Sequence, residues 1–131
     1  MVRPLEPKVL VYYPFGNYRI FGYSPEECWD IAQRVIEYTR NDFPDIRIYL
    51  CSTHRALVMS EDEIKTKRML NSWAKKYAEE NENCFYGDAF EHPPMQRKDI
   101  FAADGNHFNR IGYGLYADFW REILKDELKN Y

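Results

Sequence analysis

The alternation of apolar and polar positions divides the chain into three short strand-like runs, each followed by a longer helical segment. The first run, Lys8 to Tyr13, is rich in β-branched and aromatic residues and has apolar side chains at consecutive positions. This pattern is typical of a parallel strand that is buried on both faces, so we expect Val11 to lie in the core. The runs 46–51 and 84–87 predict two further strands, and we expect Ile48 to be equally buried.

The sequence Ser24-Pro25-Glu26-Glu27 has the features of a helix start. Ser24 can cap the helix, Pro25 suits the first helical position, and Glu27 can bond back to the cap. Apolar residues then recur at helical spacing and predict one buried face, formed by Cys28, Ile31, Ala32, Val35 and Ile36. The helix is expected to end before Pro44, because the residue before a proline disfavours the helical conformation.

Two more helices are predicted by the same reasoning. Ser60 and Glu63 have the spacing of a capping box at the start of a helix that runs to about Asn81. Its apolar face is expected to contain Leu70, Trp73, Ala74 and Tyr77. After a polar, proline-containing connection over 91–99, a last helix is predicted from about Ile111, with Leu115, Phe119, Ile123 and Leu124 facing inward.

This order of elements predicts one α/β domain over 1–131, in which βαβ units build a parallel sheet with helices on both faces. The ligand crevice of such a sheet lies beyond the carboxyl ends of its strands. Candidate residues in the loops after the strands are Gly16, Asn17, Ser52, His54 and Asp88, and the later loop holds Asp104 and His107.

Composition narrows the function classes further. The 131 residues are 45% hydrophobic, and 18 basic against 21 acidic residues leave a net charge of -3 without a charged stripe, so we expect no nucleic-acid or membrane partner. The start of the sequence has no apolar signal segment, which predicts a cytoplasmic protein if Met1 is the natural start. Three cysteines without CxxC spacing predict buried free thiols.

Asp104 and His107 are the strongest candidates for chemistry. They lie three positions apart in a glycine-containing loop, close enough for the carboxylate to hold the imidazole Nδ1–H and leave Nε2 as a base. The structural alternative is that Asp104 only caps the loop and His107 is a surface histidine. A metal site formed by His54, Asp88, Asp104 and His107 is a weaker alternative, because no pair has a recognised ligand spacing, and we expect neither metal nor cofactor.

The segment Asp104-Gly105-Asn106-His107-Phe108-Asn109-Arg110-Ile111-Gly112-Tyr113 resembles the final block, D-x-x-H-x-N-x-x-G-Y, of the SGNH (GDSL-like) hydrolases. Upstream, Tyr13-Pro14-Phe15-Gly16-Asn17 is similar to the family's G-x-N-D block, although Phe15 and Tyr18 depart from it. The resemblance implies a three-layer, flavodoxin-like α/β/α fold. It also implies that Asp104 and His107 are catalytic, that Asn17 donates to the oxyanion, and that Gly16, Tyr18, Ser52 and Asn109 contact a small ester substrate.

The family's Gly-Asp-Ser segment, which carries the nucleophilic serine, has no counterpart before Lys8. Ser52 and Cys51 lie at a strand end but lack the glycine-flanked turn of an activated nucleophile. We therefore expect an ester hydrolase-like domain for acyl esters or carbohydrate O-acetyl groups, truncated at its N-terminal end, that needs a serine from a missing segment or a partner chain. The alternative is a catalytically inactive binding module with the same fold. The exposed sheet edge predicts a homo-oligomer or a partner chain.

Overall fold

The computed structural model describes residues 6–15 and 22–131 and has the predicted alternation of strands and helices. Its elements are β1 (Val9–Tyr12), α1 (Pro25–Asp42), β2 (Arg47–Cys51), α2 (Glu61–Glu80), β3 (Cys84–Gly87) and α3 (Arg110–Leu128). Two short 3₁₀ helices, Pro93–Gln96 and Lys98–Ile100, interrupt the connection between β3 and α3 that we predicted as a loop. One turn is too short for a periodic apolar pattern, so the sequence did not reveal them.

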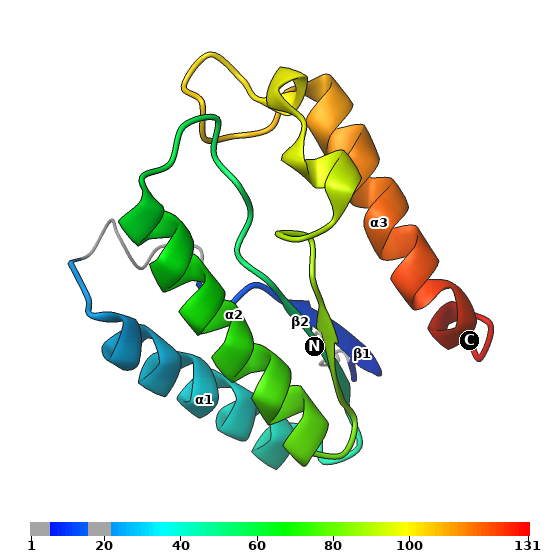
Figure 1. Cartoon of the computed structure of the whole chain (residues 1–131). Helices are drawn as coiled ribbons and strands as arrows, with labels where there is room; N and C mark the ends of the chain where they lie inside the picture. Colours follow the sequence, from blue (N-terminus) through cyan, green and yellow to red (C-terminus); the bar gives the residue numbers. More distant parts are fainter. Residues whose placement is uncertain (1–5, 16–21) are drawn as a thin grey trace, which may run out of the picture.

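The three strands form a parallel sheet in the order β1-β2-β3. Helices α1 and α2 lie together along one face, and α3 lies on the other (Figure 1). This arrangement confirms the predicted α/β fold with a parallel sheet and helices on both faces. The carboxyl ends of all three strands meet at one edge of the sheet, so the loops that follow them are close in space.

The helix starts follow the sequence prediction. Ser24 Oγ accepts a hydrogen bond from the backbone N–H of Glu27 at 3.1 Å, and the Glu27 carboxylate accepts one from the Ser24 N–H at 3.2 Å. Ser60 Oγ accepts from the N–H of Glu63 at 3.1 Å. Each bond satisfies an amide that has no partner within its helix, which fixes where α1 and α2 begin.

The main core lies between the sheet and the helices α1 and α2. Its buried residues include Ile36, Ile48, Leu50 and Leu70, each with 0% exposed surface. Trp73 and Tyr77 of α2 pack against this cluster as expected. All three cysteines are free and buried, which confirms the prediction. No helix in the described part of the chain is long and apolar enough to cross a membrane.

Three residues predicted to be buried are not. Val11 is 41% exposed, Ile31 43% and Val35 36%. Val11 shares a face with its register partner Tyr49, but on that face α3 lies over β2 and β3 rather than over the edge strand. The buried residues of α1 are Cys28, Ala32 and Ile36, so the fully buried face of this helix is narrower than its apolar pattern.

The C-terminal end of α3 is held to the sheet by one buried carboxylate. Glu127, whose side chain is 2% exposed, accepts hydrogen bonds from Arg47 at 2.5 Å, Tyr49 Oη at 2.8 Å and Tyr131 Oη at 3.2 Å. The Arg47 hydrogen bond is the main reason that the pKa of Glu127 is lowered, and the Tyr49 bond adds to it, although burial opposes the shift. Glu127 is therefore a charged anchor between α3 and β2.

Replacing Ile48 by alanine should destabilise the protein far more than the same change at Val11. Ile48 is fully buried, and such truncations cost about 2–5 kcal/mol of unfolding free energy. Val11 is partly exposed and leaves no closed cavity, so we expect a loss of about 1 kcal/mol or less. Urea denaturation of both variants measures the difference, and equal losses would contradict the assigned burial.

Glu127→Gln should lower the unfolding free energy at neutral pH by about 1.5–3 kcal/mol, the range for hydrogen bonds to a charged group. Because the folded protein lowers the pKa of Glu127, its carboxylate stabilises the fold above the unfolded-state pKa. That contribution is lost as the pH falls through the folded-state value. The difference between the two proteins should therefore shrink in acid, and a difference that stays constant with pH would refute this role.

Candidate active site

The loop that carries Asp104 and His107 is closed by backbone hydrogen bonds. Ala102 N–H donates to the His107 carbonyl at 2.8 Å, Gly105 N–H donates to the Ala102 carbonyl at 2.9 Å, and Asn109 N–H donates to the Ile100 carbonyl at 2.9 Å. Gly105 has φ +70°, a conformation that side-chain-bearing residues rarely adopt, so glycine allows the turn here. The loop is thus a tight, well-connected turn at the carboxyl side of the sheet.

Within this turn, Asp104 and His107 form the predicted pair. Asp104 Oδ2 lies 2.5 Å from His107 Nδ1, and Asp104 Oδ1 accepts hydrogen bonds from the N–H groups of Asn106 and His107, each at 2.9 Å. A carboxylate accepts, so Nδ1 carries the proton and Nε2 is left with its lone pair. The side chains are 69% exposed for His107 and 50% for Asp104.

The pKa of the Asp104 carboxyl is lowered to about 2, mainly by the hydrogen bond from His107 and further by the two backbone N–H groups. Asp104 is therefore a carboxylate across the whole pH range in which proteins normally work. The negative charge of the Asp104 carboxylate, which lies beside Nδ1–H, favours one imidazole tautomer. It also stabilises the imidazolium that forms when Nε2 accepts a proton. The pair can act as an oriented general base.

The residues after His107 anchor the turn to α3. The Asn109 side chain caps the helix by accepting from Gly112 N–H at 3.0 Å, and its Nδ2 donates to the carbonyls of Asp99 at 2.8 Å and Phe101 at 3.2 Å. Phe108 is buried in a second cluster with Ala89, Met95 and Ile100. Asn109 was predicted to contact substrate, but all its side-chain hydrogen bonds reach the protein's own backbone.

Gly112 explains a further position of the sequence block. A Cβ atom there would overlap the Ile100 carbonyl oxygen and lie 2.8 Å from Phe108 Cβ. The first turn of α3 can approach the 100–108 segment this closely only with glycine at that position. The spacing from His107 to Gly112 thus determines how closely the Asp104–His107 turn packs against the helix.

The loop after β2 forms the neighbouring wall. Leu57 N–H donates to the Gly105 carbonyl at 2.7 Å, which ties this loop to the Asp104–His107 turn. The centroid of the His54 ring lies 5.1 Å from that of Phe108 and 6.0 Å from that of Tyr13. His54 was predicted as a candidate in the loop after this strand and as a weak metal candidate, but its place beside the turn depends on loop packing that local sequence does not reveal.

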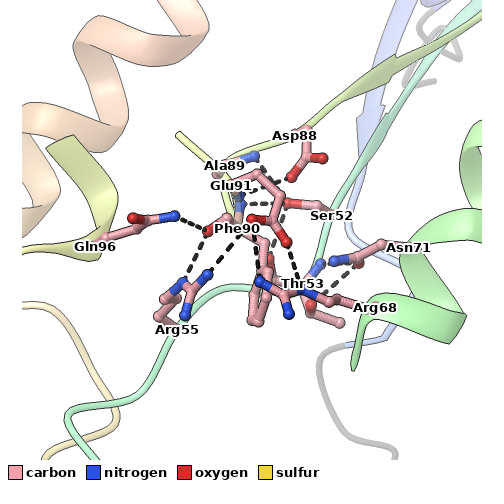
Figure 2. A network of polar contacts seen from close by, with 10 residues as sticks. All are labelled: Ser52, Thr53, Arg55, Arg68, Asn71, Asp88, Ala89, Phe90, Glu91 and Gln96. Carbon is pink, nitrogen blue, oxygen red and sulfur yellow. Dashed lines mark hydrogen bonds and ion pairs between the residues drawn. The ribbon is translucent and has the colours of Figure 1, made fainter. Parts of the chain in front are cut away.

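Ser52 is held inside the protein. Its Oγ accepts hydrogen bonds from the N–H groups of Ala89 at 2.9 Å and Phe90 at 3.1 Å, and donates to the Thr53 carbonyl at 2.8 Å. Figure 2 shows these bonds joining the end of β2 to the loop after β3. With 1% of its surface exposed, Ser52 is an interior residue that joins the two loops, and it does not form part of the surface of the site.

A charged cluster reinforces the same two loops (Figure 2). Glu91 accepts from Arg68 Nε at 2.7 Å and pairs with Arg55 at 3.6 Å, while Arg55 Nε donates to the Phe90 carbonyl at 2.9 Å. The Arg55 guanidinium also lies 4.2 Å from the centroid of the Phe90 ring. The loops beside the Asp104–His107 turn are therefore fixed by buried hydrogen bonds and partly exposed ion pairs.

Three of the other candidate residues, Gly16, Asn17 and Tyr18, lie outside the described residues. Cys51 is buried, and burial raises the pKa of its thiol to about 12, so it is not a ready nucleophile. Within 6–15 and 22–131, no group of three or more His, Cys, Asp or Glu side chains is placed to hold a metal ion. Asp88 accepts from the Glu91 N–H at 3.1 Å.

Gly112→Ala should destabilise the protein by about 1–3 kcal/mol, because the added Cβ overlaps the Ile100 backbone. It should also shift the NMR signals of the His107 ring. Gly114→Ala, two residues later on the open side of α3, has nothing within 4 Å of the added atom and is the matched control. We expect that control to be neutral or slightly stabilising. Equal melting temperatures for the two variants would contradict the close approach.

Comparisons with known proteins place this arrangement among established folds. No protein-family model and no curated protein matches the sequence. The solved structure of a family 3 carbohydrate esterase from Clostridium thermocellum is similar over 95% of this chain, with a TM-score of 0.71 and 17% sequence identity. A protein from Streptococcus pneumonia, provisionally described as a platelet activating factor, is similar over 95% of the chain, with a TM-score of 0.62 and 14% identity.

This chain spans 59% of the length of the esterase and 85% of the second protein. At such low identities, the likeness speaks for the fold alone. It confirms the predicted flavodoxin-like α/β fold with a parallel sheet.

Proposed function

We propose that this chain is an SGNH-type ester hydrolase domain that supplies the base and its orienting carboxylate, with the nucleophilic serine coming from a segment outside the chain. His107 is the general base, Asp104 orients it, and Asn17 donates to the oxyanion. The observation that carries the proposal is the 2.5 Å contact between Asp104 Oδ2 and His107 Nδ1 in an exposed turn. That contact leaves Nε2 available to a substrate or to a serine hydroxyl.

In the proposed reaction, the serine Oγ attacks the ester carbonyl carbon while His107 Nε2 takes its proton. The Asp104 carboxylate stabilises the resulting imidazolium, and the Asn17 amide donates to the oxyanion of the tetrahedral intermediate. The intermediate collapses to an acyl-enzyme, and the alcohol leaves with the proton from His107. Water then attacks the acyl-enzyme with the same proton transfers and releases the acid.

The four serines of the chain support a nucleophile from outside. Ser24 and Ser60 cap helices, Ser52 is buried with three internal hydrogen bonds, and Ser72 donates to the Met69 carbonyl at 2.6 Å. Each hydroxyl therefore has a structural role in the fold. None is placed in a turn that would expose it beside His107.

Two exposed surfaces are suited to bind the segment that carries the serine. The outer edge of β1 pairs with no strand in the described residues, and Val11 on this strand is 41% exposed. On α1, Ile31, Val35 and Tyr38 form an exposed apolar stripe. An added strand and helix would satisfy the backbone groups of β1 and cover apolar surface, which free sheet edges generally require. We propose that this segment brings the serine, as part of a longer polypeptide or as a partner chain.

A second candidate is a binding module without catalysis. The structural use of all four serines favours it, because a chain that has lost its nucleophile can keep its fold and crevice. The intact Asp104–His107 pair favours the hydrolase. Catalysis therefore separates the two candidates.

The test measures hydrolysis of short p-nitrophenyl esters by the chain mixed with a polypeptide that carries a strand followed by Gly-Asp-Ser. We expect turnover only in the mixture, and His107→Ala should reduce kcat at least 10²-fold, the lower range for general base catalysis. His92→Ala is the matched control, because the His92 ring packs against Phe119 of α3, outside the Asp104–His107 turn. Turnover that survives His107→Ala would refute the hydrolase, and absence of turnover in the mixture would favour the binding module.

Asp104→Asn tests the orienting carboxylate by itself. An amide cannot hold the imidazolium as a carboxylate does, so we expect a loss of kcat of at least 10²-fold with little change in KM. The folded state should remain, because Asn can still accept from the two backbone N–H groups. A circular dichroism spectrum like that of the unmodified chain checks this point. A change confined to KM would contradict the assigned role.

A further inference from the structure

His54 lies beside the Asp104–His107 turn. It follows β2 by three residues, its ring packs against Phe108, and Phe108 directly follows His107 in the chain. The main chain at His54 is held in place by α2, because Lys67 Nζ donates to the His54 carbonyl at 3.0 Å. The hydrogen bond from Leu57 to Gly105 then joins this loop to the turn of His107. His54 is therefore fixed beside the proposed base.

One ring nitrogen of His54 is hydrogen-bonded within the protein, and the other makes no hydrogen bond to the described residues. Nδ1 lies 2.9 Å from the Arg55 carbonyl oxygen, and because a carbonyl only accepts, Nδ1 must carry the hydrogen. Nε2 then has a lone pair. It makes no hydrogen bond within the described residues, so none of them uses its lone pair.

The surroundings keep this imidazole neutral. Burial is the main cause that lowers the pKa of His54, and the positive charge of Lys67 lowers it further, against the opposing hydrogen bond to Arg55. A neutral imidazole of this tautomer accepts a hydrogen bond at Nε2 and cannot attract an anion there. The rings of Tyr13 and Phe108 lie beside it, with centroids 6.0 Å and 5.1 Å away. The group that fits this acceptor is an uncharged donor, such as an alcohol hydroxyl.

We propose that His54 is a substrate-recognition residue, whose Nε2 accepts a hydrogen bond from a free hydroxyl on the alcohol portion of the ester held at His107. This inference rests on the proposed function and names the residue that would distinguish, among acyl and carbohydrate esters, those whose alcohol portion carries a free hydroxyl. A crevice with this acceptor binds a hydroxyl-bearing ester better than an analogue without the hydroxyl, because the analogue leaves Nε2 unpaired.

The test compares glycerol monoacetate with ethyl acetate, two neutral acetate esters that differ in free hydroxyl groups. Each is titrated into the unmodified chain, His54→Phe and His54→Gln, and NMR signals of the His107 ring report binding. Phenylalanine keeps a ring between Tyr13 and Phe108 but removes both nitrogens. Glutamine brings a carbonyl oxygen near the position of Nε2.

We expect His54→Phe to weaken the binding of glycerol monoacetate about three- to tenfold, the range for one neutral hydrogen bond, and to leave ethyl acetate unchanged. His54→Gln should recover part of the preference. Equal binding of the two esters by the unmodified chain, no binding of either, or equal losses in His54→Phe would overturn the proposal.

A second measurement covers the case in which His54→Phe does not fold. In the unmodified chain, the ¹⁵N signal of His54 Nε2 should move on addition of glycerol monoacetate and stay in place with ethyl acetate, and a fixed signal in both titrations would refute the contact. Binding needs no serine, so this result is separate from the hydrolase proposal. A hydroxyl preference without turnover in the mixture removes the hydrolase alone, whereas turnover without the preference removes only the role of His54.

Discussion

The contact between the start of α3 and the 100–108 segment is the constraint on which the site depends. Asn109 caps the helix and ties it to the carbonyls of Asp99 and Phe101, and Gly112 lets the helix approach the Ile100 backbone. With the helix in this position, the Asp104 to His107 turn has little freedom. An exposed Asp–His pair needs such support, because surrounding protein does not hold the imidazole in place by burial.

The rest of α3 makes this contact durable. At its far end, Glu127 bonds to Arg47 and Tyr49, so the helix is held by the 100–108 segment at its start and by β2 at its end. Between them, Gly87 of β3 leaves space for Trp120, since a Cβ there would lie 2.7 Å from the Trp120 ring. The Asp104–His107 turn is thus tied to the sheet through α3, while the side chains of the pair are exposed to solvent.

The loops after β2 and β3 hold each other in place beside this turn. Buried hydrogen bonds of Ser52 and the ion pairs of Glu91 fix them to each other, and Leu57 joins them to the Asp104–His107 turn. The hydroxyl of Ser52 is used entirely within the protein, whereas His54 and His107 each bond to the protein through Nδ1 alone.

Local sequence determined a large part of this protein. Strand runs, capping serines, the Asp104–His107 pair and the free cysteines could all be predicted, because each depends on contacts between residues near in the chain or on simple periodicity. Only the tertiary structure decided the exposure of Val11, Ile31 and Val35, the internal use of Ser52 and Asn109, and the position of His54. Those features depend on which elements pack together, and an apolar or polar residue carries no local mark of the partner that tertiary packing will bring to it.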